Sequence, residues 1–82
     1  MIKIVTRFEP YPAANPQGYC VGFTVVAENG RQGYIDTVVP LDDCSGKIDA
    51  QIVELGETLL QEGITNMYNQ LIQLNLLVGS IV

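Results

Sequence analysis

The chain has 82 residues, of which 48% are hydrophobic, and nine acidic against four basic side chains give it a net charge of −5. This length predicts a single small domain over residues 1–82 with a thin core, and the apolar content excludes a disordered chain. Nucleic-acid phosphates are bound by clustered Lys and Arg, so the acidic composition argues against a nucleic-acid partner.

The first predicted element is a strand over residues 2–8, where side chains of different polarity alternate. The alternation predicts that Ile2, Ile4 and Phe8 share one face and that Val5 lies on the other.

A proline-rich segment follows this strand. Residues 9–18 hold three of the four prolines. Because proline fixes φ and lacks a backbone N–H, we expect a loop here. Residues 19–28 form the clearest strand, Glu-Asn-Gly-Arg at 28–31 is a hairpin signal, and residues 33–41 form the returning strand.

The hairpin sequence leaves two registers open. A two-residue turn places Asp36 opposite Phe23, whereas a loop of odd length gathers apolar side chains on one face. Because a slip by one residue reverses the faces of a strand, we expect the odd loop, with Gly30 or Gly33 at positive φ. The expected pairs are Val25–Ile35, Phe23–Thr37, Val21–Val39 and Tyr19–Leu41.

The reverse face of this hairpin mixes polar and apolar side chains. A sheet with only one covered face alternates more cleanly, so we expect something to cover part of this second side. The residues assigned to it are Cys20, Thr24, Val26, Tyr34, Asp36 and Val38, joined by Val5.

A helix is predicted over residues 47–62, with Ser45 or Asp43 as its N-cap and Gly63 at its C-terminal cap. Its core stripe consists of Ile48, Ile52, Leu55 and Leu59, flanked by Val53 and Leu60. Gly56 borders this stripe, which leaves close packing against the sheet and simple tolerance of a glycine as alternatives.

The last twenty residues, from Gly63 to Val82, contain no charged side chain. A surface helix normally shows charges on its outer face, so this segment predicts burial, either in the fold or against another copy. A second helix is expected over residues 65–74 or 65–76, and residues 76–82 are expected to add a strand or to lie across a neighbouring subunit. The candidate oligomer interface consists of Ile64, Met67, Tyr68, Leu71, Leu74, Ile81 and Val82.

The sequence contains no motif for catalysis or cofactor binding. There is no histidine, and Cys20 and Cys44 form no CxxC pair, so metal and nucleophile sites lack their usual partners. A position near a helix start leaves Cys44 open to a lowered pKa. Adjacent carboxylates at a strand-to-helix turn favour helix capping over metal binding. The candidate contacts for a partner or ligand are Tyr11, Asp36, Asp42 and Asp43.

The sequence therefore predicts a non-enzymatic protein without a cofactor or metal. Because the N-terminal residues do not resemble a signal peptide and no apolar run approaches ~20 residues, we expect a cytoplasmic protein that does not bind membranes.

Strands first and helices after predict an α+β fold, with a three-stranded antiparallel sheet followed by two helices and room for a short C-terminal strand. This order of elements resembles that of small antitoxins of the HicB type and of many small phage or mobile-element proteins. The expected function is that of an interaction protein that forms a homo-oligomer, a dimer or higher, through its uncharged C-terminal segment. The alternative is an acidic inhibitor or antitoxin-like protein that binds a basic protein partner.

Overall fold

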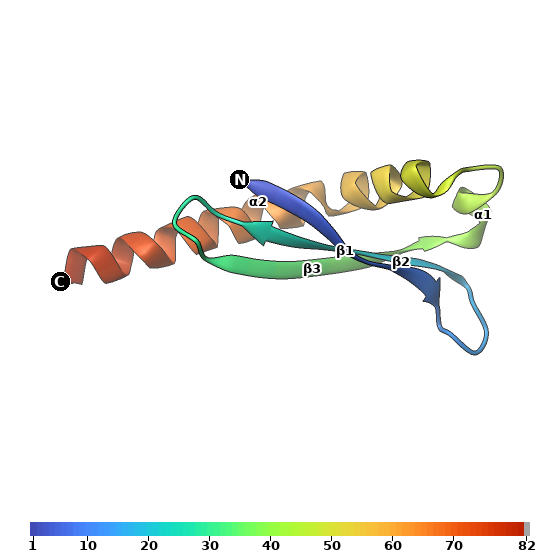
Figure 1. Ribbon diagram of the computed structural model, residues 1–82, viewed down its shortest axis with the longest axis horizontal. Coiled ribbons are helices and arrows are strands. Elements are labelled where there is room, and N and C mark those ends of the chain that lie inside the picture. Colours follow the sequence, from blue (N-terminus) through green and yellow to red (C-terminus); the bar gives the residue numbers. More distant parts are fainter. Residues whose placement is uncertain (82) are drawn as a thin grey trace.

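The computed structural model describes the backbone of residues 1–81 and the side chains of residues 1–73. Its elements are β1 (Ile2–Tyr11), β2 (Gly18–Val26), β3 (Gln32–Pro40), α1 (Leu41–Cys44) and α2 (Asp49–Ile81). The strands form one antiparallel sheet in the order β1-β2-β3, and α2 lies across one of its faces (Figure 1). This is the expected α+β arrangement. In this described part of the chain, no helix has the length and apolarity needed to cross a membrane.

The core lies between the central strand β2 and helix α2. Val21 and Val25 are fully buried and Phe23 is 3% exposed, and all three face the helix. The helix contributes Ile52, Leu60, Ile64 and Leu71 to the same cluster. The alternating apolar residues of β2 thus form one side of the core, and the apolar residues of α2 form the other.

Strand β1 is longer than the sequence predicts. It runs to Tyr11 and includes Pro10, so that the loop shrinks to residues 12–17. Because β1 is an edge strand, a residue without a backbone N–H is tolerated at that position.

A bulge breaks the alternation of β1. The pairing with β2 shifts between Val5 and Arg7. Phe8 therefore faces α2, while Ile2 and Ile4 face the opposite side of the sheet, and the expectation that these three share a face is wrong. Val5 lies opposite Phe23 on the helix face, so its predicted place on the reverse face is also wrong. A bulge adds one residue to a strand and reverses every later side chain, and simple alternation does not reveal it.

The hairpin loop has odd length, as expected. The Ala27 N–H donates to the Arg31 carbonyl oxygen (2.9 Å) around residues 28–30, and Gly30 has a φ of 85°. The predicted faces of β2 and β3 are confirmed, but the predicted pairs are wrong by two residues, because Phe23 lies opposite Ile35. A shift of two residues keeps every side chain on its face, so alternation alone does not distinguish the two registers.

Helix α2 is continuous, and the predicted break at Gly63 is wrong. Gly63 lies inside the helix, where an added Cβ would stand 2.7 Å from Cδ1 of Ile35. Helix and strand thus lie close together at this glycine, with the end of the Ile35 side chain between them. Residues 76–81 continue α2, so the strand expected in that stretch is not formed, and the helix runs past its predicted end at residue 74 or 76.

The start of α2 is also capped differently from the prediction. The Ile48 N–H donates to Oε1 of Gln51 (3.1 Å), which is the reverse half of a capping box. Neither Ser45 nor Asp43 caps α2, because the short helix α1 ends at Cys44 and residues 45–48 connect the two helices.

The buried stripe of α2 is rotated from the predicted one. Ile48 and Leu59, which the sequence assigns to the core, are 67% and 61% exposed. The buried positions follow a spacing of four residues, through Ile52, Gly56, Leu60 and Ile64. An added Cβ at Gly56 would lie 2.8 Å from Cβ of Val21, so the helix lies close to the central strand at this glycine, and this contact favours the side of the helix that faces inward.

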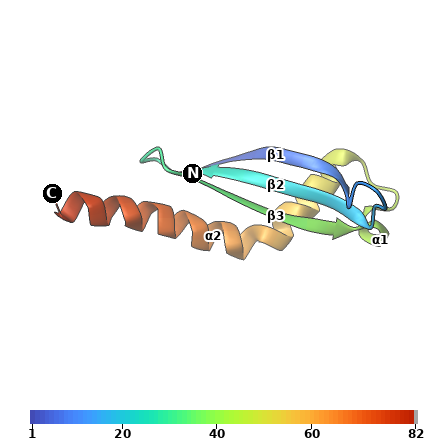
Figure 2. The same ribbon diagram turned by 90° about the horizontal axis from the view of Figure 1, so that it is seen from below.

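The molecule is elongated because α2 is longer than the strands of the sheet. Its 33 residues span about 50 Å, whereas a nine-residue strand spans about 30 Å. The longest dimension of the chain is 52 Å, and the radius of gyration is 15.2 Å, against roughly 12 Å for a compact chain of this length. At the hairpin tip, Nδ2 of Asn29 donates to the carbonyl oxygen of Leu71 (3.1 Å). Beyond this contact α2 continues past the sheet (Figures 1 and 2).

Candidate interaction surface

The side of the sheet away from α2 is covered by no other element of the described chain. We call it the open face. The expectation that something covers part of this second side is therefore not met within one copy of the chain. The pairing of the strands assigns it these side chains: Ile2, Ile4, Arg7, Glu9 and Tyr11 from β1, Cys20, Thr24 and Val26 from β2, and Gln32, Tyr34, Asp36 and Val38 from β3.

Exposed apolar side chains gather on the open face towards the N-terminus of β1. Ile2 is 60% exposed and Ile4 is 47% exposed. The neighbouring strand adds Val26 directly opposite Ile2. Apolar groups that lie together on an exposed face mark an interaction surface more often than single exposed residues do.

Arg7 is the centre of a polar cluster in the middle of the open face. Its guanidinium forms an ion pair with Glu9, and its Nη1 lies 3.5 Å from Oδ2 of Asp36. The same guanidinium lies 5.7 Å from the centroid of the Tyr11 ring. These contacts come from both edge strands, so Arg7 links β1 to β3 across β2.

Gly22 leaves the space for this cluster. The side chain of Tyr34 lies over Gly22, where any Cβ would collide with the phenol ring. Hydrogen bonds with Glu9 and Tyr34 raise the pKa of Arg7. Desolvation raises the pKa of Tyr34, and its hydrogen bond with Asp36 acts in the same direction. The cluster thus holds one cation, Arg7, between two carboxylates. Arg and Tyr side chains often contribute most of the binding energy at protein interfaces, so this cluster is suited to binding a protein.

The structure brings together two of the four predicted contact residues. Tyr11 and Asp36 both touch Arg7, whereas Asp42 and Asp43 lie exposed in the first turn of α1. Among the described residues, no three His, Cys, Asp or Glu side chains are grouped closely enough to hold a metal ion. Sequence reasoning did not select Arg7 as a contact residue. It placed Arg7 on the same face as Val5, whereas the bulge in β1 puts these two side chains on opposite faces.

Both cysteines are buried and unpaired. Burial raises the pKa of the Cys20 thiol and of the Cys44 thiol. Cys44 is the last residue of α1 and donates to the carbonyl oxygen of Val39 (Sγ–O 3.6 Å). The lowered pKa considered for Cys44 from its place near a helix start is therefore wrong.

The predicted oligomer interface falls partly in the core of the chain itself. Ile64 is 3% exposed and Leu71 is 9% exposed, both against the sheet, and Met67 and Tyr68 are half-buried beside them. The side chains of Leu74 and Ile81, and all of Val82, lie outside the described residues.

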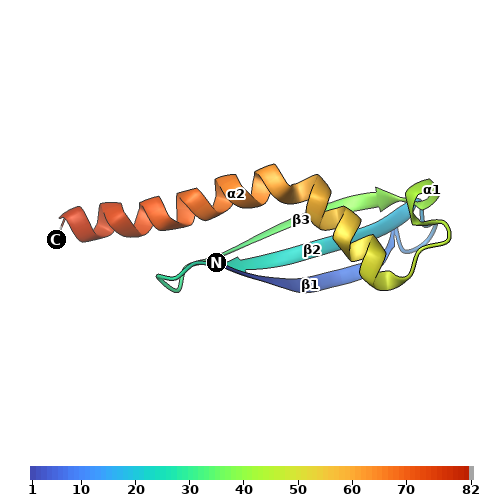
Figure 3. The ribbon, with the colours of Figure 1, turned by 90° about the horizontal axis from the view of Figure 1, so that it is seen from above.

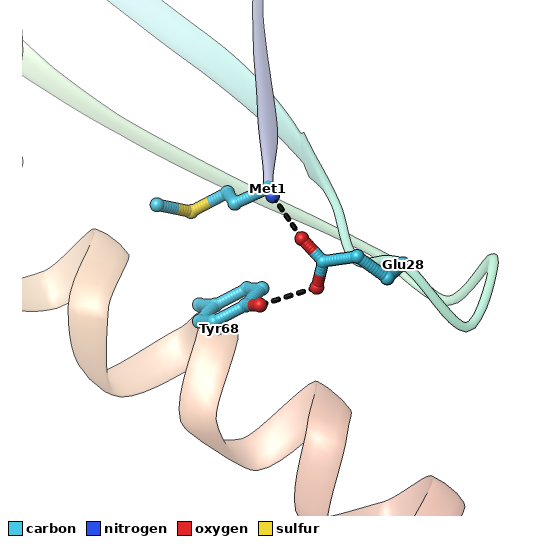
Figure 4. A network of polar contacts seen from close by, with 3 residues as sticks. All are labelled: Met1, Glu28 and Tyr68. Atoms are coloured by element: carbon cyan, nitrogen blue, oxygen red, sulfur yellow. Dashed lines mark hydrogen bonds and ion pairs between the residues drawn. The ribbon is translucent and has the colours of Figure 1, made fainter.

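Glu28 ties the hairpin to the chain terminus and to α2. Its carboxylate accepts hydrogen bonds from the Met1 ammonium and from the Tyr68 hydroxyl (Figure 4). These two bonds lower the pKa of Glu28 from 4.5 to about 2. The contact holds the hairpin against the middle of α2.

We expect this contact to make stability depend on pH. A carboxyl whose pKa is lower in the folded chain contributes stability that is present above 4.5 and is lost as the pH falls towards about 2. Thermal melts between these limits should therefore show a smaller drop in melting temperature for Glu28→Gln than for the wild type. Because Glu28 is largely exposed, the difference should shrink in high salt. Equal slopes for both proteins would contradict the role of this contact.

Searches against family models, curated proteins and solved structures return no match for this chain. The functional proposal therefore rests on its own residues.

Proposed function

We propose that the protein is a non-enzymatic interaction protein that self-associates through the C-terminal half of α2. The observation that carries this proposal is the extension of α2 past the hairpin tip, in a stretch of sequence without a charged side chain (Figure 1). A helix that leaves its own sheet needs another surface for its apolar residues.

The sequence spacing of this helix supports the proposal. Ile64, Met67 and Leu71 pack on the sheet, and in the sequence the same spacing continues at Leu74, Val78 and Ile81. Apolar residues that alternate at three and four positions are typical of helices that pack against another helix. The first part of α2 thus packs on the protein's own sheet, and its last part packs on a second copy.

Removing residues 74–82 is expected to abolish self-association while the fold remains. Among the described side chains, the last core residues of α2 are Leu71 and Ile72, so a chain that stops at Gln73 keeps every one of those contacts. Light scattering should then give the mass of one chain, and calorimetry should show only a small fall in melting temperature.

A full-length Gln73→Ala variant is the matched control, because Gln73 is exposed at the point of truncation; it should keep the wild-type mass. A wild type that has the mass of one chain at every concentration would contradict the proposal, as would a truncated chain that still associates.

The acidic residues of α1 favour a second candidate function, the binding of a basic protein. Asp42 and Asp43 are both exposed at the end of the sheet where β3 stops. Affinity based on such charges falls as salt rises. Capture of a basic partner should therefore weaken in high salt and on replacing both residues with asparagine, whereas capture that is indifferent to salt would count against this function.

A further inference from the structure

The two edges of the sheet differ in their protection against pairing with another strand. Strand β1 carries a bulge, Lys3 and Pro10, three features that block strand addition. Strand β3 pairs with β2 in unbroken register from Gln32 to Pro40 and has no lysine and no proline before its last residue. A long, regular edge without such protection is a template for another strand.

Hydrogen bonds at the two ends of the β2-β3 ladder show which backbone groups of β3 are free. The Ala27 N–H donates to the Arg31 oxygen, and at the other end the Leu41 N–H donates to the Gln17 oxygen. Because bonded pairs alternate along an antiparallel ladder, the odd-numbered residues of β3 bond to β2. The even-numbered residues, among them Asp36 and Val38, direct their N–H and C=O groups towards the free edge.

Helix α2 overhangs this free edge. It starts over β1 and β2, crosses the sheet diagonally, and runs outside β3 in both face-on views (Figures 2 and 3). Glu57 forms an ion pair with Lys3 of β1, so that flank of the helix faces β1. Leu59 follows two positions later, about 200° around the helix. It therefore faces the β3 flank, where it is 61% exposed.

We propose that β3 pairs antiparallel with β3 of a second copy, which gives a continuous six-stranded sheet with both α2 helices on one face. This inference rests on the proposed self-association and adds a second contact to it. An added strand takes up the free N–H and C=O groups of β3 and lies beneath the overhanging helix, where it covers Leu59.

The charges of β3 select the register of this pair. Centring the two-fold axis on Asp36 would place two carboxylates opposite each other, which is destabilising. Centring it on Thr37 places Ile35 opposite the partner subunit's Val39 on the helix face, and Asp36 opposite the partner subunit's Val38 on the open face. This register joins apolar side chains on the helix face and separates the two Asp36 carboxylates on the open face.

A proline at position 38 tests the pairing directly. Val38 directs its N–H to the free edge, so Val38→Pro leaves the β2-β3 hydrogen bonds in place and removes a bond to the partner in both copies. We expect the dissociation constant for self-association to rise roughly tenfold or more, with little change in the circular dichroism spectrum. An unchanged dissociation constant would overturn the β3 pairing.

A cysteine crosslink provides a measurement that does not depend on how well the proline variant folds. At a centre on Thr37, the two Thr37 residues form a pair without hydrogen bonds, with Cα atoms about 4.5 Å apart, which suits a disulfide. Thr37→Cys should therefore form a covalent dimer when oxidised glutathione accepts the two electrons of the thiols. Thr6→Cys on the protected edge is the matched control and should stay largely monomeric.

The outcomes separate this inference from the proposed function. A wild type that never associates overturns both. A wild type that associates, but whose Thr37→Cys variant crosslinks no more than Thr6→Cys, keeps the proposed function and overturns the β3 pairing. Crosslinking at Thr37, together with a monomeric truncated chain, supports both contacts.

Discussion

Replacing Gly56 with alanine is expected to destabilise the protein by about 1–2 kcal/mol, although alanine normally stabilises a helix. The new Cβ would lie 2.8 Å from Cβ and 2.9 Å from Cγ1 of Val21. Val21 is fully buried on the central strand, so neither atom has room to retreat. The helix must move away from the sheet and loosen the contacts of its neighbours.

Gly63→Ala is the matched control, because it makes the same chemical change seven residues later in the same helix. There an added Cβ would meet only the Cδ1 atom of Ile35, the far end of a flexible, half-buried side chain. We expect a neutral effect or a gain of up to ~1 kcal/mol from helix propensity. Urea unfolding of both variants measures the contrast. Equal effects at the two positions would show that Val21 does not fix the height of α2 above the sheet.

The type and order of the elements were predictable from local patterns. Alternation in residues 19–28 and the glycine in the turn at 28–31 are enough to predict a hairpin, and the absence of charge after Glu62 correctly predicts burial for Ile64 and Leu71. These features depend on side-chain polarity along a single segment, so they do not require knowledge of the packing.

The errors arose where packing decides between equivalent local choices. A glycine fits either a helix end or a close helix-strand contact, and at Gly63 the contact with Ile35 prevails. A register shift of two residues preserves the faces of β3, and only the turn at residues 28–30 selects between the pairs. The set of buried residues in α2 depends on which side of the helix fits against Val21. The spacing of apolar residues in the sequence does not specify that side.

The contacts of the polar cluster on the open face could not be predicted from the sequence for a related reason. Arg7, Glu9 and Asp36 belong to the two edge strands and meet only because β2 lies between them in register. The bulge in β1 then turns Arg7 to the side of Asp36. Sequence reasoning selected Tyr11 and Asp36 as contact residues but had no means of placing them around one guanidinium.

Leu71→Glu is expected to destabilise the chain by about 4 kcal/mol or more, the largest effect of the substitutions considered. Burial of a leucine side chain contributes ~1.5–3 kcal/mol, and an unpaired carboxylate at the same place adds a desolvation cost. A domain of this size has a free energy of unfolding of roughly 4–12 kcal/mol, so a large share of the chains should unfold. The hairpin is affected as well, because Asn29 bonds to the backbone of Leu71.

The neighbouring Gln70→Glu variant separates the loss of packing from the added charge. Gln70 is exposed, so the same carboxylate there should change stability by less than ~0.5 kcal/mol. Calorimetry and light scattering on both variants then identify the surface to which Leu71 belongs. A Leu71→Glu chain with a wild-type melting temperature and the mass of one copy would place this residue in an interface between copies. Unfolding places it in the protomer core and leaves residues 74–82 as the part of α2 that the proposed self-association requires.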